Sequence, residues 1–432
     1  MGQKSSQAKD KVKQEYLKII NSKKKDYYKK NEEILNSSDF KVISQQNWKD
    51  YMQQEIELIK DKYSRSSWPL DILSLVNQWN TVKDYKWRSN VLWYDYLQSY
   101  KVNTAQDPTP VTTISVSQVT SQYTNSFEAQ SLIEFLHGHF QNPNEHFIAA
   151  MIGRFNSSFL QEYCLENNEL KGNVQTVPKV YSEKMCEDIK GFVMLTLQAM
   201  IHYYGGVVAK TIEEKPGEMY DLMLEEVFTN SLQQSLLKVF HLANKDKCDL
   251  YEENLEKYSG LTCNDLGIHR YFQLDVEHNK PSKVQGNFGN AIYIEGILNQ
   301  PRNFKAYGKA VDKLRELENQ FSPLKKLGVV IQTSRVLCEC VDEYWKDDTT
   351  VSKDDLVISA DQILSIFLYI VIKAKIPDLS GHVQMICEFG RKIIQNGSMG
   401  YYVTTLEACV EQVETMSPEL LMKIKEYSLK GY

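Results

Sequence analysis

The stretch Ser359-Ala-Asp-Gln-Ile-Leu-Ser-Ile-Phe-Leu-Tyr-Ile-Val-Ile-Lys-Ala374 decides the fold of the last part of this chain. Its apolar run, Ile366 to Ile372, is the longest in the sequence and is closed by Lys373. A membrane span needs about 20 apolar residues, so the run predicts a helix buried on nearly all sides of a protein core. Ser359 is placed to cap this helix, and Asp361 falls in its first turn, where a carboxylate complements the helix dipole.

Apolar residues recur at helical spacing through much of the remaining sequence. Between residues 147 and 159 they follow the i, i+3, i+4, i+7 pattern, and a similar run between residues 189 and 200 ends near Gly205-Gly206, a helix-stop signal. Pro216-Gly217 then starts a new amphipathic stretch. We therefore predict an all-α protein, with a helical bundle over residues 126–215.

Tryptophans are concentrated between residues 42 and 100. This region contains five of the six, Trp48, Trp68, Trp79, Trp87 and Trp93, among apolar residues at helical spacings. It predicts a Trp-rich helical segment in which the rings pack between helices, with a docking surface as the alternative. Residues 101–125 include Asp107-Pro-Thr-Pro110 and carry no helical stripe, so they predict a linker.

The first residues predict a membrane-binding arm over residues 1–41. Met1-Gly2-Gln3-Lys4-Ser5-Ser6 fits the N-myristoylation pattern, with Gly2 as the lipidation candidate. The first thirty residues contain ten lysines against three acidic residues. A single myristoyl chain binds only marginally, at about 10⁴ M⁻¹, and a basic arm on an anionic membrane surface supplies a second signal. The alternative is a fortuitous glycine followed by a solvated tail.

Other function classes lack sequence support. The chain has no GxxxxGK[ST] loop, GxGxxG fingerprint, GxSxG elbow or HExxH pair. Its eight cysteines form no CxxC pair and have no partner histidines at zinc-site spacing, so we predict reduced thiols and no metal site. The net charge is -6 and no nucleic-acid fold signature accompanies the basic arm. We predict no cofactor and no nucleic-acid partner.

Five segments in the second half of the chain, taken in order, resemble the Vps-nine (vacuolar protein sorting nine) domain of Rab guanine-nucleotide exchange factors. They are Glu218-Met-Tyr-Asp-Leu-Met-Leu-Glu-Glu-Val-Phe228, Leu261-Thr-Cys-Asn-Asp-Leu-Gly-Ile268, Ser322-Pro-Leu-Lys-Lys-Leu327, the stretch 359–374 and Gly400-Tyr-Tyr-Val-Thr-Thr-Leu-Glu-Ala408. The resemblance implies a layered helical exchange domain over residues 216–420, supported by the bundle before it and followed by a tail, residues 421–432.

The resemblance also implies a function and a site. Members of the family promote release of GDP from Rab-type GTPases without covalent chemistry. In them the aspartate at the Asp361 position is presented to the nucleotide site, where it pairs with the phosphate-binding lysine and disfavours magnesium and the β-phosphate. Tyr401 and Thr404 match the residues that contact the GTPase switch regions. The implied partner is an endosomal, Rab-five-like GTPase, and the implied location is cytoplasmic, peripheral on endosomal or other vesicular membranes.

Two positions depart from the family pattern at the predicted GTPase-binding surface. Gln362 replaces its second aspartate, and Ser365 stands where the family has a proline. A proline in the first turn rigidifies the start of a helix and offers an apolar contact, so serine there predicts looser docking of the GTPase. A helical adaptor that binds Rab GTPases or endosomal partners without catalysing exchange is therefore the alternative function.

Overall fold

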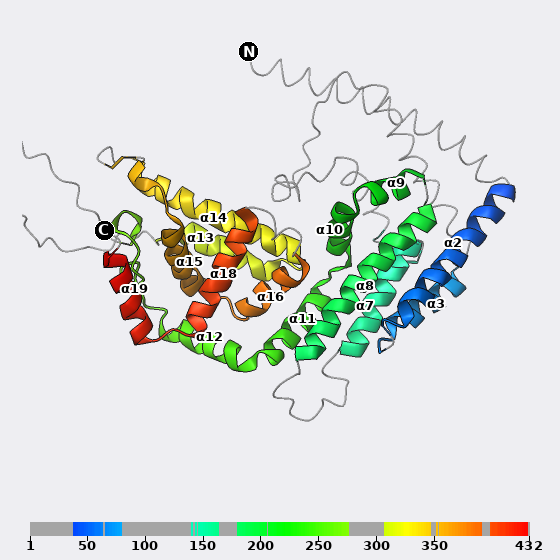
Figure 1. The fold of residues 1–432 in the computed structure, drawn as a ribbon, viewed down its shortest axis with the longest axis horizontal. Helices are drawn as coiled ribbons and strands as arrows, with labels where there is room; N and C mark the ends of the chain where they lie inside the picture. The colour runs from blue at the N-terminus through cyan, green and yellow to red at the C-terminus, as the bar shows by residue number, and fades with distance from the viewer. Residues whose placement is uncertain are drawn as a thin grey trace, which may run out of the picture. The chain divides into compact units, whose positions relative to one another are not determined.

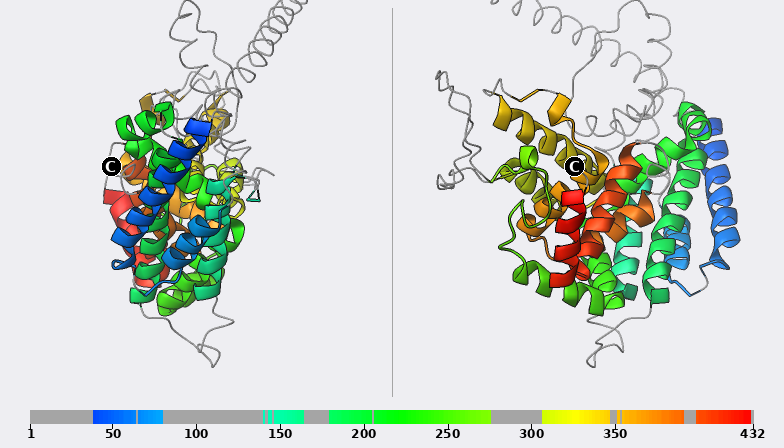
Figure 2. Two further views of the ribbon diagram at one scale, coloured as in Figure 1. Left: turned by 90° about the vertical axis from the view of Figure 1, so that its right-hand side faces the viewer. Right: turned by 60° about the vertical axis from the view of Figure 1, so that its left-hand side comes forward.

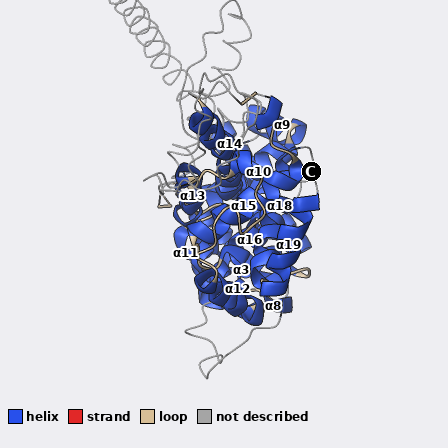
Figure 3. Ribbon diagram, turned by 90° about the vertical axis from the view of Figure 1, so that its left-hand side faces the viewer, coloured by secondary structure: helices blue, strands red, loops and turns tan. Residues whose placement is uncertain are grey.

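A computed structural model describes residues 38–63, 65–79, 140, 143–144, 146–163, 179–204, 206–275, 306–346, 351–352, 354–390 and 398–430. The regular structure of these residues is entirely helical, with no strand, so the all-α prediction is confirmed (Figure 1, Figure 3). Within the same ranges, no helix has both the length and the apolar character needed to cross a membrane. Gly2 and the rest of residues 1–37, the predicted linker 101–125, Trp87 and Trp93 lie outside the described residues.

The chain divides into two compact units. Unit 1 comprises Met1–Asn173 and Glu183–Ser235, and unit 2 comprises Val174–Ser182 and Leu236–Tyr432. The helices that begin before the division between residues 235 and 236 are α2 (Ser38–Lys60), α3 (Trp68–Gln78), α7 (Phe147–Tyr163), α8 (Lys179–Tyr204), α9 (Gly206–Glu214) and α10 (Pro216–Val227), and residues 179–182 of α8 are assigned to unit 2. The division falls within α11 (Asn230–Ala243), while the predicted domain boundary at residue 216 stays a prediction.

Unit 1 is held by aromatic packing. Helix α3 packs against both α2 and α7 (Figure 2). Trp48 and Trp68 are almost fully buried; the Trp48 ring lies 4.5 Å from that of Phe147, and the Trp68 ring meets Phe155 and Phe192 edge-on. Trp79 is also buried. The described tryptophans therefore pack between helices, as predicted, because burying such large rings contributes more than exposing them.

Unit 2 is built around α15 (Ala360–Ala374). Its other helices are α12 (Lys245–Lys257), η2 (Arg270–Phe272), α13 (Gly308–Arg315), η3 (Glu316–Asn319), α14 (Pro323–Trp345), η4 (Asp354–Leu356), α16 (Leu379–Phe389), α18 (Ser398–Glu414) and α19 (Pro418–Lys430). Helices α13 and α18 pack against α15, and every residue from Ile366 to Ile372 is buried. The apolar run thus forms the core predicted for it.

Side chains form hydrogen bonds with free backbone groups at both ends of α15. At its start, the Ser359 hydroxyl accepts a hydrogen bond from the backbone N–H of Gln362, as predicted. At its end, the Arg315 guanidinium donates to the carbonyl oxygens of Ala374 at 3.0 Å and Lys373 at 3.1 Å. Lys375 then leaves the helix in the left-handed region, with φ of 50°. This anchoring at both ends fixes where the first turn of α15, with Asp361, lies in the unit.

Candidate functional site

Asp361 lies in the first turn of α15, two residues after the capping Ser359. Its side chain is exposed and has no hydrogen bond or ion pair with any described residue. The apolar half of α15 is buried in unit 2, so the helix is rigidly held while this carboxylate faces solvent. An unpaired carboxylate on a fixed helix start is free to bind a cation or a hydrogen-bond donor on another molecule.

The side chain of Gln362, the next residue, is hydrogen-bonded within the chain. Its side-chain oxygen Oε1 accepts a hydrogen bond of 2.7 Å from the backbone N–H of His269. The segment that follows His269 is fastened at two further points, because Trp345 Nε1 donates to the Tyr271 carbonyl and the Tyr307 hydroxyl donates to that of Phe272, both at 2.7 Å. Gln362 therefore links the first turn of α15 to η2. Its predicted contact with a GTPase stays a prediction.

Tyr401 connects the start of α18 to the same turn of α15. Its hydroxyl donates a hydrogen bond of 3.2 Å to the carbonyl oxygen of Ala360, the neighbour of Asp361. The side chain remains 39% exposed, so one surface of the ring is available to a partner. The structure thus brings together two sequence segments that are some forty residues apart.

Thr404 and Ser365 flank this contact. Thr404 is exposed one turn after Tyr401, and its hydroxyl lies 2.9 Å from the Tyr401 carbonyl and 3.0 Å from that of Gly400. It donates to its own helix and keeps acceptor capacity for a partner. Ser365 is half-buried one turn beyond Asp361 on α15. Asp361, Tyr401 and Thr404 are therefore the exposed members of the predicted set.

An exposed apolar residue, Val357, was not predicted. It lies two residues before Ser359 and is 72% exposed. A single exposed apolar side chain is ordinary on a protein surface, so Val357 is of interest only because it lies beside the capped start of α15. The signal in the sequence is a lone valine in the polar stretch that precedes the cap, which is too weak to single out without coordinates.

The family model of the Vacuolar sorting protein 9 (VPS9) domain matches residues 307–418. The match runs from the start of α13 to the start of α19 and includes all five residues of the predicted GTPase-binding site. Residues 307–418 form a VPS9 domain. VPS9 domains are Rab exchange factors and not enzymes of covalent chemistry, and the exposed carboxylate, tyrosine and threonine lie within this domain.

Curated relatives match over part of the chain. Alsin from Rattus norvegicus and Alsin from Homo sapiens are each 32% identical over 108 residues, which is 25% of this chain and 6% of Alsin. VPS9 domain-containing protein 1 from Homo sapiens is 23% identical over 199 residues, 45% of this chain and 28% of that protein. The chain therefore spans only a small part of these relatives, and the homology is distant.

Gln362→Ala is expected to weaken the first turn of α15. Removing the acceptor leaves the half-buried His269 N–H unsatisfied, which costs about 1 to 3 kcal/mol of unfolding free energy. Urea unfolding of the full chain checks this value. Gln362→Glu is the matched control because it retains an acceptor oxygen at the same reach, and equal destabilisation by both variants would contradict the role of the hydrogen bond.

Proposed function

We propose that this chain is a guanine-nucleotide exchange factor for an endosomal, Rab-five-like GTPase. The observation that carries the proposal is the hydrogen bond from Tyr401 to the Ala360 carbonyl, since it joins α18 to the helix start that exposes Asp361. Both lie in the VPS9 domain. Asp361, Tyr401 and Thr404 then form one surface to which a GTPase binds, with Val357 adding an exposed apolar side chain.

In the proposed mechanism Asp361 competes with the nucleotide for positive charge. The carboxylate pairs with the phosphate-binding lysine of the GTPase, which removes a cation from the β-phosphate and places a like charge beside it. Magnesium and nucleotide are then held less tightly. Because coupling is reciprocal, a protein that binds the nucleotide-free GTPase better than the loaded one must weaken nucleotide binding by the same factor.

Tyr401 and Thr404 supply positioning in this mechanism. The Tyr401 ring is anchored at its hydroxyl to α15 and exposes part of its face, which suits contact with an apolar switch region. The Thr404 hydroxyl retains an acceptor for a backbone N–H of the GTPase. Ser365 presents no rigid proline surface, so selectivity among Rab proteins rests more on Tyr401 and Thr404.

The adaptor function has one observation in its favour. Gln362 is occupied by His269, so the first turn of α15 presents one free carboxylate to a GTPase. A non-catalytic adaptor would bind the GTP-loaded form at least as well as the nucleotide-free form. A protein with equal affinity for both forms does not change the affinity of the GTPase for its nucleotide.

Release of fluorescent GDP from a panel of Rab proteins by the full chain tests the proposal. We expect acceleration for Rab-five-like members and none for a Ras-type GTPase, the matched control. Binding of loaded Rab without acceleration of release would establish the adaptor function instead.

The proposed location is the cytoplasmic face of endosomal membranes. It rests on the basic arm and Gly2, which lie outside the described residues, and on the lysine excess of the first thirty residues.

A further inference from the structure

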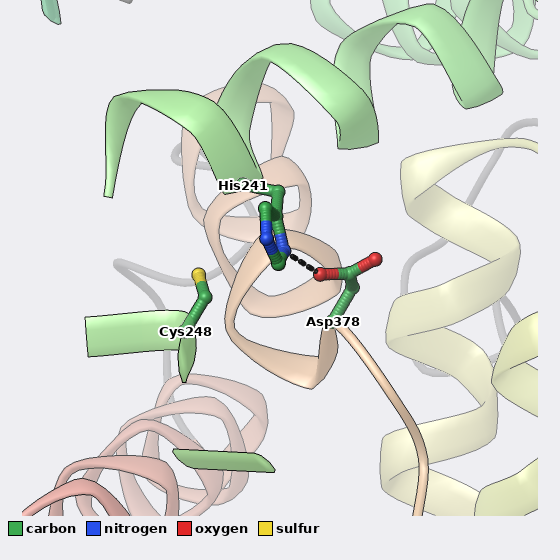
Figure 4. Close-up of side chains that lie close together, drawn as sticks. All are labelled: His241, Cys248 and Asp378. Atoms are coloured by element: carbon green, nitrogen blue, oxygen red, sulfur yellow. Dashed lines mark hydrogen bonds and ion pairs between the residues drawn. The ribbon is translucent and has the colours of Figure 1, made fainter. Parts of the chain in front are cut away.

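A histidine, a cysteine and an aspartate from three elements of unit 2 lie close together, and none of them belongs to the predicted GTPase-binding set. His241 lies in the last turn of α11, Cys248 in the first turn of α12 and Asp378 at the start of α16. One potential ligand atom from each residue lies within 4.8 Å of the other two (Figure 4). His241 and Asp378 are 137 positions apart along the chain, so the fold brings the cluster together.

Asp378 is held in an unusual conformation that directs its carboxylate to His241. Its φ is 52°, in the left-handed region that few residues other than glycine, asparagine and aspartate adopt. Aspartate at a helix start usually accepts a hydrogen bond from the first turn, yet its side chain makes no such cap. The carboxylate instead pairs with His241 Nδ1, as Figure 4 shows.

Cys248 is a buried thiol surrounded by negative charge. Burial, and then the negative charges of Asp378, Glu414, Glu252 and Asp249, together raise the pKa of the thiol to about 12. Asp249 also lies 3.9 Å from His241 Nε2, although Lys245 pairs with it at 2.7 Å. The field that opposes a lone thiolate here favours a bound cation.

We propose that His241, Cys248 and Asp378 bind a divalent transition-metal ion, zinc in the first instance. Imidazole nitrogen, thiolate sulfur and carboxylate oxygen are the three ligand types that zinc takes in proteins, and a water completes a tetrahedral set. On binding, Cys248 releases its thiol proton to solvent and coordinates as the thiolate. The ion replaces the hydrogen bond between His241 and Asp378.

The geometry requires a modest contraction. Zinc bonds of about 2.0 to 2.3 Å bring the three ligand atoms to within about 3.5 Å of one another. His241 and Asp378 are half-exposed, so rotation of their side chains can supply this movement while Cys248 stays buried. The bound ion would fasten the junction of α11 and α12 to the start of α16.

Cobalt(II) titration of the chelator-treated full chain tests the site. We expect one equivalent to bind with visible ligand-field bands and a near-ultraviolet thiolate charge-transfer band, and zinc to displace it. Cys248→Ser and His241→Gln should each weaken binding more than about 100-fold, and Asp378→Asn about tenfold. Cys338→Ser, which changes an exposed thiol on α14, is the matched control and should bind as the wild type does.

Three outcomes would overturn the proposal. They are the absence of a thiolate band in the wild type at saturating cobalt, its survival in Cys248→Ser, and full affinity in His241→Gln. With any of these outcomes, the cluster would be a hydrogen-bonded contact without a metal. Circular dichroism monitors whether Cys248→Ser folds, and His241→Gln tests the same site at a half-exposed side chain.

Discussion

Asp361→Asn is expected to lower the acceleration of GDP release about 10- to 100-fold. A hydrogen bond to a charged group contributes about 1.5 to 3 kcal/mol, and each 1.4 kcal/mol changes a rate about tenfold. The fold should be unaffected, because the side chain is exposed and has no partner among the described residues. Loss of its favourable position near the helix dipole costs only about 0.3 to 1 kcal/mol.

The measurement is GDP release from the most responsive Rab protein at several concentrations of each variant. Asp355→Asn is the matched control, since it removes the same charge from an exposed side chain in η4, six residues earlier. We expect it to retain the wild-type rate. Equal loss in both variants would assign the effect to long-range electrostatic attraction, and an unchanged rate in Asp361→Asn would exclude the proposed competition.

Equilibrium binding gives a second readout of the same prediction. If Asp361 acts by displacing nucleotide, its loss must weaken binding to the nucleotide-free GTPase by the same factor as it restores nucleotide affinity. Affinity for the loaded GTPase should change little. A uniform loss of affinity for both forms would instead identify Asp361 as an ordinary docking contact.

The sequence predicts α15 and its cap because every signal there is local. The apolar run exceeds one helical face, Ser359 stands where a cap is needed, and both were found in the structure. The resemblance similarly located the VPS9 domain, since three of its five ordered segments lie within the matched residues 307–418. Local propensity and a family pattern thus suffice for the fold of this part of the chain.

Contacts between distant residues could not be predicted in this way. The Gln362 side chain appears from sequence as an altered signature position, yet its partner is a backbone N–H 93 residues away. Likewise, His241, Cys248 and Asp378 have no recognisable metal-site spacing, because the fold and not the local sequence brings them together. Spacing rules detect sites that lie on one helix or one loop.

The burial of two titratable side chains could not be predicted from the sequence either. Lysine side chains are mostly exposed in proteins, but that of Lys326 is fully buried in unit 2 and donates to the Leu317 carbonyl at 2.7 Å. Burial lowers the pKa of this lysine to about 7. His382 on α16 is similarly buried, and its Nδ1 has no hydrogen-bond partner among the described residues.

His382 is expected to make unit 2 lose stability as pH falls below 6.5. Burial, and then the charge of Lys326, lower the pKa of the imidazole from 6.5 to about 3 in the folded chain. Between pH 6.5 and about 3 the unfolded chain binds a proton that the folded chain does not bind, so the free energy of unfolding falls with decreasing pH. The slope approaches about 1.4 kcal/mol per pH unit, and the full shift corresponds to roughly 5 kcal/mol.

Lys326 extends the same dependence to higher pH. Its folded pKa of about 7 lies below the ordinary value of 10.5, so between these values the unfolded chain again binds the additional proton. The free energy of unfolding therefore rises as the pH increases from about 7 to 10.5. The His382 contribution is best isolated between about pH 5 and 6.5, above the ordinary pKa values of carboxylates and below the range in which Lys326 titrates. Substitution at His382 should therefore remove the slope in this window and leave the slope above about pH 7, which belongs to Lys326, unchanged.

Hydrogen exchange of peptides from α14 and α16 at increasing urea, corrected for intrinsic rates, measures this stability in the full chain. Wild type should lose about 2 kcal/mol between pH 6.5 and 5, and His382→Leu should be nearly flat, because leucine fills the site without a titratable nitrogen. His202→Leu, at a histidine stacked on Tyr51 in unit 1, is the control and should keep the wild-type slope. An identical slope in His382→Leu would place the acid sensitivity in other groups of the unit, the half-buried Glu414 carboxyl among them, whose pKa is raised by burial.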